Sequence, residues 1–233
     1  MKIETFAVCY NEEKMLPYFL RHYLQYGSVT IFDNHSTDRS VEIAQTMGAV
    51  VIEYDSDNKF REDTLIHLKN ICWKESEADW VIIVDIDEFV YHRNLLWILE
   101  RTEGTVIMPK MFEMFSEIFP TTPVQIYDEV RVGIEMKSKM CLFRPDQITE
   151  MDYDCGAHFA HPKGNFILNV RTEIIALHFK YLSLEYIASK YAELNVRRSE
   201  EDKQRGWSSH MERTREELQK EFEIMKYGLM KIV

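Results

Sequence analysis

The first half of the chain alternates short apolar runs with amphipathic stretches, and this alternation limits the possible folds more than any other feature. Five apolar runs are predicted strands: 2–10, 29–33, 49–53, 80–84 and 105–109. Between the first four, the spacing of apolar residues predicts one helix from about Pro17 to Gly27, a capped short one over 36–48 and a longer one over 62–76. Because the strands are apolar on both faces, helices must cover both sides of the sheet. The sequence therefore predicts an α/β fold with a mixed, mostly parallel sheet flanked by helices.

The second half is less regular until it becomes helical again. Strand-like pieces occur at 130–136, 139–143 and 165–170. From Leu184 onward, apolar residues recur at helical spacing, which predicts C-terminal helices separated by a charged loop at 197–210.

Charge and composition exclude several other kinds of protein. The net charge of −11 argues against a nucleic-acid surface, which needs clustered Lys and Arg. The four cysteines are far apart and form no CxxC pair, so we expect neither a zinc site nor disulfides, and a reducing cytoplasm fits best. No run approaches the roughly 18 apolar residues of a membrane span, so we expect a soluble, cytoplasmic protein. Peripheral contact with the inner face of a membrane stays open.

Polar residues follow three of the predicted strands. They are Asn11 and Glu12 after the first, Asp33 and Asn34 after the second, and Asp85 and Asp87 after the fourth. In parallel sheets, ligands bind beyond the carboxyl ends of the strands. The sequence therefore predicts a ligand site at this edge of the sheet.

The stretch WVIIVDIDEFVY, residues 80–91, places two carboxylates at the end of an apolar strand. Extended geometry would point Asp85 and Asp87 to the same side, where two charges about 4 Å apart repel by roughly 4 kcal/mol. A proton, a basic residue or a cation must relieve this repulsion, and nothing basic follows in sequence until His92. A divalent ion such as Mg²⁺ or Mn²⁺, which would in turn hold a diphosphate, is the favoured solution. Solvated acids in a turn are the alternative.

Three ordered segments together resemble a known family. CYNEEKMLPYFLRHYLQYG, VTIFDNHSTDRS and WVIIVDIDEF look like the family 2-like glycosyltransferases with the GT-A fold, in the branch whose DxD motif is extended to D-x-D-E-F. The segment ALHFKYLSLEYIASKY is more weakly similar. The resemblance implies a hexosyltransferase-like enzyme that moves a sugar from a nucleotide-diphosphate sugar, most simply a UDP-sugar, to a hydroxyl of a carbohydrate or glycolipid acceptor. It implies a metal ion, Mn²⁺ or Mg²⁺, and inversion at the anomeric carbon.

The resemblance also assigns roles to particular residues. It implies donor binding by Tyr10, Asn11, Asp33, Lys69, Asn70 and Asp85, and metal binding by Asp85, Asp87 and His178. In these roles Tyr10 and Asn11 lie beside the base and Asp33 at its polar edge. A solvated Lys69 and a structural His178 remain the alternatives.

The base that would deprotonate the acceptor is not assigned by the resemblance. Asp154 and His158, in the dense polar stretch 152–165, are the leading candidates, with Asp152 and Glu113 also open. Glu88 has no assigned role. The stretch 203–210 could be a lid over the donor or an ordinary surface loop.

The resemblance divides the chain into a GT-A domain at 1–182 and a helical extension at 183–233. Within the domain, 1–109 would be the nucleotide-sugar-binding half and 110–182 the acceptor half. Two other functions stay open: a nucleotidyltransferase, and a nucleotide- or sugar-binding module of the same fold without turnover.

Overall fold

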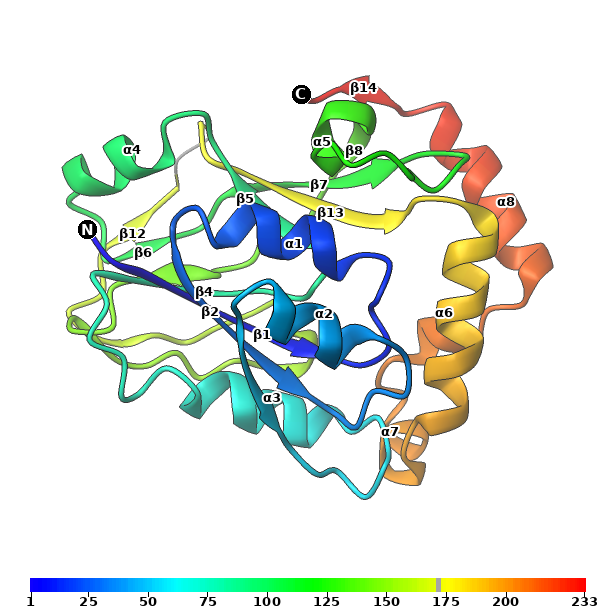
Figure 1. Ribbon diagram of the computed structural model, residues 1–233, viewed down its shortest axis with the longest axis horizontal. Coiled ribbons are helices and arrows are strands. Elements are labelled where there is room, and N and C mark those ends of the chain that lie inside the picture. Colours follow the sequence, from blue (N-terminus) through cyan, green and yellow to red (C-terminus); the bar gives the residue numbers. More distant parts are fainter. Residues whose placement is uncertain (171–172) are drawn as a thin grey trace.

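The computed structural model, which describes residues 1–170 and 173–233, is built on a seven-stranded sheet (Figure 1). Its strand order is β12-β6-β9-β4-β1-β2-β3. The bounds are β1 Ile3–Cys9, β2 Gly27–Asp33, β3 Val50–Glu53, β4 Trp80–Ile83, β6 Val106–Ile107, β9 Leu142–Phe143 and β12 Leu168–Asn169. The pairs β1–β2, β1–β4, β2–β3 and β6–β12 are parallel, and β9 runs antiparallel to both β4 and β6. The predicted α/β class with a mixed, mostly parallel sheet is confirmed.

Helices cover both faces of this sheet, as the apolar strands require. They are α1 Leu16–Tyr23, α2 Ser40–Thr46, α3 Glu62–Ile71 and α4 Leu95–Arg101. Alternate residues of β1 point to opposite sides. Ile3 and Ala7 pack with α1 and α2 in one core, whereas Phe6 packs in a second core against Trp73 and Leu68, at the α3 side.

A second sheet lies beside the first and has the order β14-β8-β7-β13-β5. Its strands are β5 Glu88–Tyr91, β7 Lys110–Phe115, β8 Val132–Met136, β13 Ile175–Tyr181 and β14 Met230–Lys231. The chain passes from β4 in the first sheet to β5 in the second through residues 84–87. The Glu88 amide donates to the Asp85 carbonyl at 2.9 Å across this turn. The extended geometry expected through Asp85 and Asp87 is therefore wrong, since both stand in a tight turn between two sheets.

The remaining elements complete the second half. They are α5 Ile126–Glu129, α6 Leu184–Arg197, α7 Glu200–Arg205 and α8 Arg215–Lys226, the short pair β10 Ile148–Glu150 and β11 Lys163–Gly164, and the 3₁₀ turns η1 Cys155–Ala157 and η2 Ser209–Glu212. The predicted C-terminal helices are confirmed. The predicted loop at 197–210 is wrong, because the Ser199 hydroxyl accepts from the Asp202 amide at 3.1 Å and starts α7. Gly206, at φ 68°, ends that helix.

Two predicted helix ends also differ from the structure. The helix expected to reach residue 76 ends at Ile71, because the following residues form tighter turns, including a bond from the Lys74 amide to the Ile71 carbonyl at 3.1 Å. The first helix ends at Tyr23, and Gly27 begins β2 instead of closing the helix. A Cβ on Gly27 would lie 2.0 Å from the Ile3 carbonyl oxygen, so the close approach of β1 explains the glycine.

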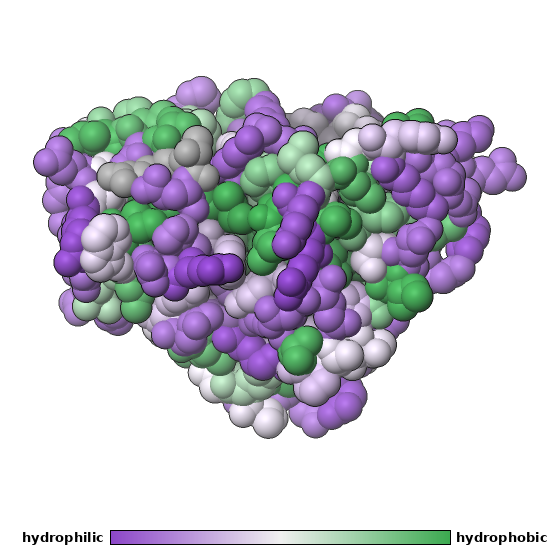
Figure 2. Space-filling model, turned by 90° about the horizontal axis from the view of Figure 1, so that it is seen from above, coloured by the Kyte–Doolittle hydropathy of each residue, from purple (hydrophilic) through white to green (hydrophobic). Residues whose placement is uncertain are grey.

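Hydrophilic residues cover most of the face seen in Figure 2, with hydrophobic residues in smaller groups between them. Within residues 1–170 and 173–233, every helix is too short or too polar to cross a membrane. The predicted peripheral membrane contact stays a prediction.

Because His22 on α1 is buried in its neutral form, we expect the protein to lose stability in acid. It is fully buried, with Nε2 2.9 Å from the Val90 carbonyl oxygen, and this burial lowers its pKa to about 4. The unfolded chain, with a histidine pKa of about 6.5, takes up the proton first. The contribution of neutral His22 is therefore present above about pH 6.5 and is lost as the pH falls toward 4, by roughly 3 kcal/mol. Urea unfolding between pH 7.5 and pH 4.5 should show a shallower pH dependence in His22→Gln. An unchanged slope would contradict this assignment.

Candidate functional site

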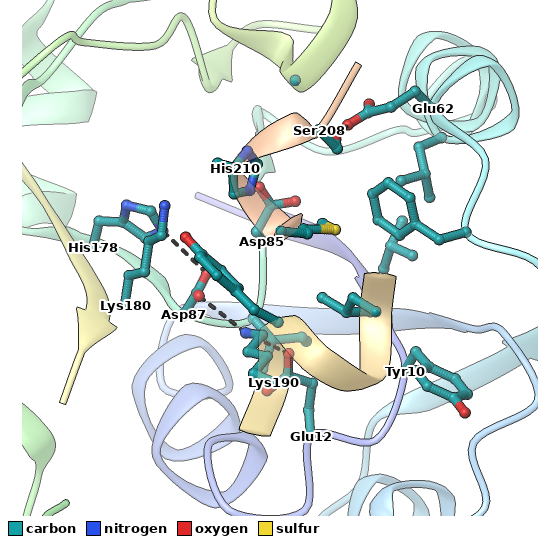
Figure 3. A pocket seen from close by; sticks show the side chains of 18 of the residues that line it. Tyr10, Glu12, Glu62, Asp85, Asp87, His178, Lys180, Lys190, Ser208 and His210 are labelled. Carbon is teal, nitrogen blue, oxygen red and sulfur yellow. Dashed lines mark hydrogen bonds and ion pairs between the residues drawn. The ribbon is translucent and has the colours of Figure 1, made fainter. Parts of the chain in front are cut away.

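A cavity of about 410 Å³ opens at the carboxyl ends of β1, β2 and β4. Figure 3 shows its residues converging from several elements. Tyr10 follows β1, Asp87 comes from the β4–β5 turn, Lys180 from β13, Lys190 from α6 and His210 from η2. The edge predicted from the strand ends is therefore the wall of a real cavity. The C-terminal segment adds the opposite wall.

Asp85 is compensated by two lysines. Its Oδ1 accepts from Lys69 Nζ at 2.7 Å, and its Oδ2 lies 3.3 Å from Lys139 Nζ. Burial alone would raise the pKa of Asp85, but these two ammonium groups outweigh it and hold that pKa well below its usual range. Lys139 also forms an ion pair with Glu88, whose other oxygen accepts from the Asp85 amide at 3.2 Å. Glu88 therefore fixes both the turn and the lysine.

Asp87 belongs to a second ionic group. Its Oδ2 lies 3.1 Å from Lys190 Nζ, and its Oδ1 lies 3.5 Å from His178 Nε2. Lys190 also contacts Glu12 at 2.7 Å, and His178 Nδ1 lies 3.3 Å from Glu113. Burial opposes the charged form of His178, yet the Glu113 and Asp87 carboxylates raise its pKa to about 10. Burial also opposes the charged form of Asp87, but Lys190 and His178 hold its pKa well below the usual range. Burial raises the pKa of Glu12 to about 7 against the opposing charge of Lys190.

The predicted metal ligands have suitable donor atoms but do not form a metal site. Asp85, Asp87 and His178 offer carboxylate oxygens and an imidazole nitrogen, which Mn²⁺ accepts. Among residues 1–170 and 173–233, however, no group of three or more His, Cys, Asp or Glu could hold a metal ion. Both oxygens of Asp85 face lysines, and Lys190 bridges Asp87 and Glu12. The Mn²⁺ or Mg²⁺ that the resemblance implies therefore stays a prediction.

The end of the cavity near β1 and β2 carries an aromatic ring and an unpaired carboxylate oxygen. The Arg197 guanidinium lies 3.4 Å from the Tyr10 ring centroid and donates to Asn34 Oδ1 at 2.6 Å. Asp33 is buried just behind the cavity wall, where its Oδ2 accepts from the Ser36 amide at 2.9 Å. Among residues 1–170 and 173–233, its Oδ1 has no hydrogen-bond partner. A buried carboxylate oxygen without a partner is rare, so Asp33 has a free acceptor at this end.

Two predicted donor residues support the walls instead of lining the cavity. Asn11 Oδ1 accepts from the Thr37 amide at 2.8 Å, which ties the loop after β1 to the loop after β2. Asn70 Oδ1 accepts from the Tyr153 amide at 2.9 Å. Tyr10, Lys69, Asp85, Asp87 and His178, in contrast, line the cavity.

The four candidate bases separate into two groups. Asp154 and Asp152 are exposed, paired with His161 at 3.4 Å and Lys163 at 3.6 Å, and are not among the lining residues. His158 and Glu113 do line the cavity. The His158 residue is exposed overall, but partial burial of its ring, with the Lys139 charge, lowers its pKa to about 4, so its imidazole is neutral at pH 7.

Sequence reasoning missed several basic residues of the site, among them Lys139, Lys190 and Arg197. Lys190 had a detectable signal, because Tyr186 and Ile187, which precede it at helical spacing, belong to the apolar face of α6 and are buried. A lysine on a buried face requires an acidic partner. Lys139, in an irregular stretch, gave no such signal.

No protein-family model matches the chain, and no curated protein matches its sequence. Among solved structures, it is similar to S. aureus TarS, with 15% identity and a TM-score of 0.48 over 84% of this chain and 39% of that one. It is also similar to S. aureus TarS 1–349 in complex with UDP-GlcNAc, with 15% identity and a TM-score of 0.46 over 84% of this chain and 66% of that one. A third similar structure is Mycobacterium tuberculosis glucosyl-3-phosphoglycerate synthase in complex with Mn²⁺, UDP and glucosyl-3-phosphoglycerate. Its identity is 17% and its TM-score 0.34, over 48% of this chain and 44% of that one. The chain thus spans less than two thirds of the length of each of these proteins. The α/β architecture with a mixed, mostly parallel sheet that the sequence predicts is the one that the structure has.

Proposed function

We propose that the protein is a glycosyltransferase that moves a sugar from a nucleotide-diphosphate sugar, with a UDP-sugar as the first candidate, to an acceptor hydroxyl. The observation that carries the proposal is the cavity itself. It joins an aromatic ring at Tyr10, with the free Asp33 oxygen behind it, to the charged β4–β5 turn. A ring and a hydrogen-bond acceptor suit a nucleobase, and buried ammonium groups suit a diphosphate.

The direction of the donor follows from the order of these groups. The base would lie at the Tyr10 end, with its polar edge toward Asp33. The diphosphate would lie near Lys69, Lys139 and Lys190, which are the lysines around the β4–β5 turn. The sugar would then face His178, Glu113 and His158, where the acceptor enters. The division into a nucleotide half at 1–109 and an acceptor half at 110–182 stays a prediction, because Lys139 and Lys190 come from outside the first half.

The chain's own residues supply binding, charge and a proton acceptor. Fixed ammonium groups stabilise the negative charge that develops on a departing diphosphate. Attack of the acceptor hydroxyl from the opposite side would invert the anomeric carbon, and its proton would pass to His158 or Glu113, the candidate bases that line the cavity. Substituting each separately, as His158→Gln and Glu113→Gln, identifies the base. Loss of transfer with retained donor binding marks the residue responsible.

The proposal is tested with nucleotides and metal ions. Calorimetric titration should show UDP binding that UMP reproduces only weakly, because the lysines recognise the diphosphate. The same titration with Mn²⁺, Mg²⁺ or EDTA tests the predicted ion, which would have to displace Lys190 from Asp87. Slow release of sugar from a UDP-sugar would exclude the binding module without turnover. Absence of nucleotide binding under all three conditions would refute the proposal.

A further inference from the structure

Lys180 differs from the other basic residues of the cavity. Elsewhere along its wall, lysine and arginine side chains have acidic or amide partners: Lys69, Lys139 and Lys190 near the β4–β5 turn, and Arg61, Arg197 and Arg213 around them. Over the part of the chain that the structure describes, the Lys180 ammonium has no hydrogen bond or ion pair. It faces only the rings of Tyr181 and Tyr191, at 5.6 and 5.3 Å from their centroids.

A second unpaired group lies next to it. The Tyr191 hydroxyl is buried, and no described residue forms a hydrogen bond with it. The Tyr191 ring also packs against the His210 ring, with the centroids 5.2 Å apart, so this tyrosine contacts both Lys180 and His210. Partly buried cations and buried hydroxyls are costly without partners. A bound anion would satisfy both.

The position of Lys180 separates it from the proposed donor phosphates. Figure 3 shows Lys180 beside His178 on β13, at the opposite end of the view from Tyr10 and beyond Asp87. The carboxylates whose charges act on Lys180 are Glu113 and Asp87. Both already lie in ion pairs, Glu113 with His178 and Asp87 with Lys190. An anion at Lys180 would therefore lie on the acceptor side of the β4–β5 turn.

We propose that Lys180, Tyr191 and His210 bind an anionic group of the acceptor, a phosphate or a carboxylate. This inference rests on the proposed transferase function and narrows its acceptor from any carbohydrate or glycolipid to one that carries such a charge near the reacting hydroxyl. The ammonium supplies the charge, and the tyrosine hydroxyl and the imidazole supply directed hydrogen bonds. An acceptor without the anionic group would leave the Lys180 ammonium and the Tyr191 hydroxyl without partners. The cavity would therefore select against uncharged acceptors.

The test compares small molecules that share a three-carbon hydroxylated backbone and differ in whether they carry a phosphate, a carboxylate or neither. With UDP at saturation, calorimetric titration should detect glycerol 3-phosphate or glycerate but not glycerol, and the better of the two anions identifies the group. Lys180→Met should weaken binding of that anion at least about tenfold and leave the UDP affinity within about threefold. Lys180→Arg should restore most of the anion binding. Lys14→Met, which removes an exposed lysine outside the cavity, is the matched control and should change neither affinity.

Tyr191→Phe keeps the ring and removes only the unpaired hydroxyl, so it tests the site without a large risk to folding. It should weaken anion binding about threefold or more. The inference is overturned if neither anion binds, or if Lys180→Met weakens UDP about tenfold, because the lysine would then serve the donor. If no nucleotide binds but the anion still binds through Lys180, the anion site stands and the proposed donor function fails.

Discussion

Asp87→Asn is expected to lower kcat/KM for sugar transfer about a hundredfold to a thousandfold, the largest loss from any single substitution in the cavity. Asparagine keeps the shape of the side chain but removes the charge that holds Lys190 at 3.1 Å and His178 at 3.5 Å. Lys190 would then pair with Glu12 alone, and the imidazole with Glu113 alone. The groups that face the diphosphate and the sugar would both lose their fixed positions, which catalysis requires. Initial rates with a UDP-sugar over a range of donor concentrations measure this loss.

The control for Asp87→Asn is Asp146→Asn, which removes the same charge at an exposed position outside the cavity. That variant should transfer sugar at the wild-type rate. Urea unfolding of both proteins shows whether either substitution affects the fold. If folded Asp87→Asn retained a third or more of the wild-type kcat/KM, the β4–β5 turn would not be the reacting centre.

The parts of the fold that could be predicted are those encoded by local periodicity. The strands β1 to β4 and the helices between them follow from apolar spacing within each segment, and the structure confirms them. The strand-like pieces predicted at 139–143 and 165–170 contain β9 and β12, but each strand has only two residues. Their pairs with β4 and β6, which are distant in sequence, could not be predicted from local spacing. Helix α7 consists of charged residues and one glutamine and has no apolar period, so its start depends on the cap from Ser199. Such elements are set by tertiary contacts and single hydrogen bonds.

The candidate site also has features that the local sequence could predict and features that it could not. Two carboxylates after an apolar strand indicate a site, and the repulsion between them correctly predicts that something must compensate. The search for a compensating base near residues 85–87 failed because the partners lie far away in sequence. Lys69, Lys139 and Lys190 are 16, 54 and 103 residues from the carboxylates that they contact. Only the packed tertiary structure brings such partners together. The local sequence therefore indicated that the two carboxylates need a positive partner, but not which residues supply it.

Lys190→Met is expected to reduce the free energy of unfolding by about 3–5 kcal/mol, the largest stability effect in the cavity. Methionine has nearly the volume of the lysine stem, so packing on α6 is kept and the change removes mainly the charge. Glu12 and Asp87 would remain buried, with side chains about one-tenth exposed, and without the ammonium that contacts both. Urea unfolding at pH 7.5 measures the difference. Lys220→Met, an exposed lysine on α8, is the matched control and should change stability by less than about 0.5 kcal/mol.

A second substitution separates the ionic contact from any general damage to α6. In the Lys190→Met background, Glu12→Gln removes one of the two carboxylates that lost their cation, so it should recover part of the lost stability. In the wild-type background the same Glu12→Gln should be destabilising, because it takes a partner away from Lys190 at 2.7 Å. The opposite signs give a coupling free energy of about 1–3 kcal/mol in a double-mutant cycle. Additive effects, or a loss in Lys190→Met no larger than in Lys220→Met, would show that Lys190 does not hold these carboxylates together. The positive charge assigned to the diphosphate would then have to come from Lys69 and Lys139, which contact Asp85 from the other side of the turn.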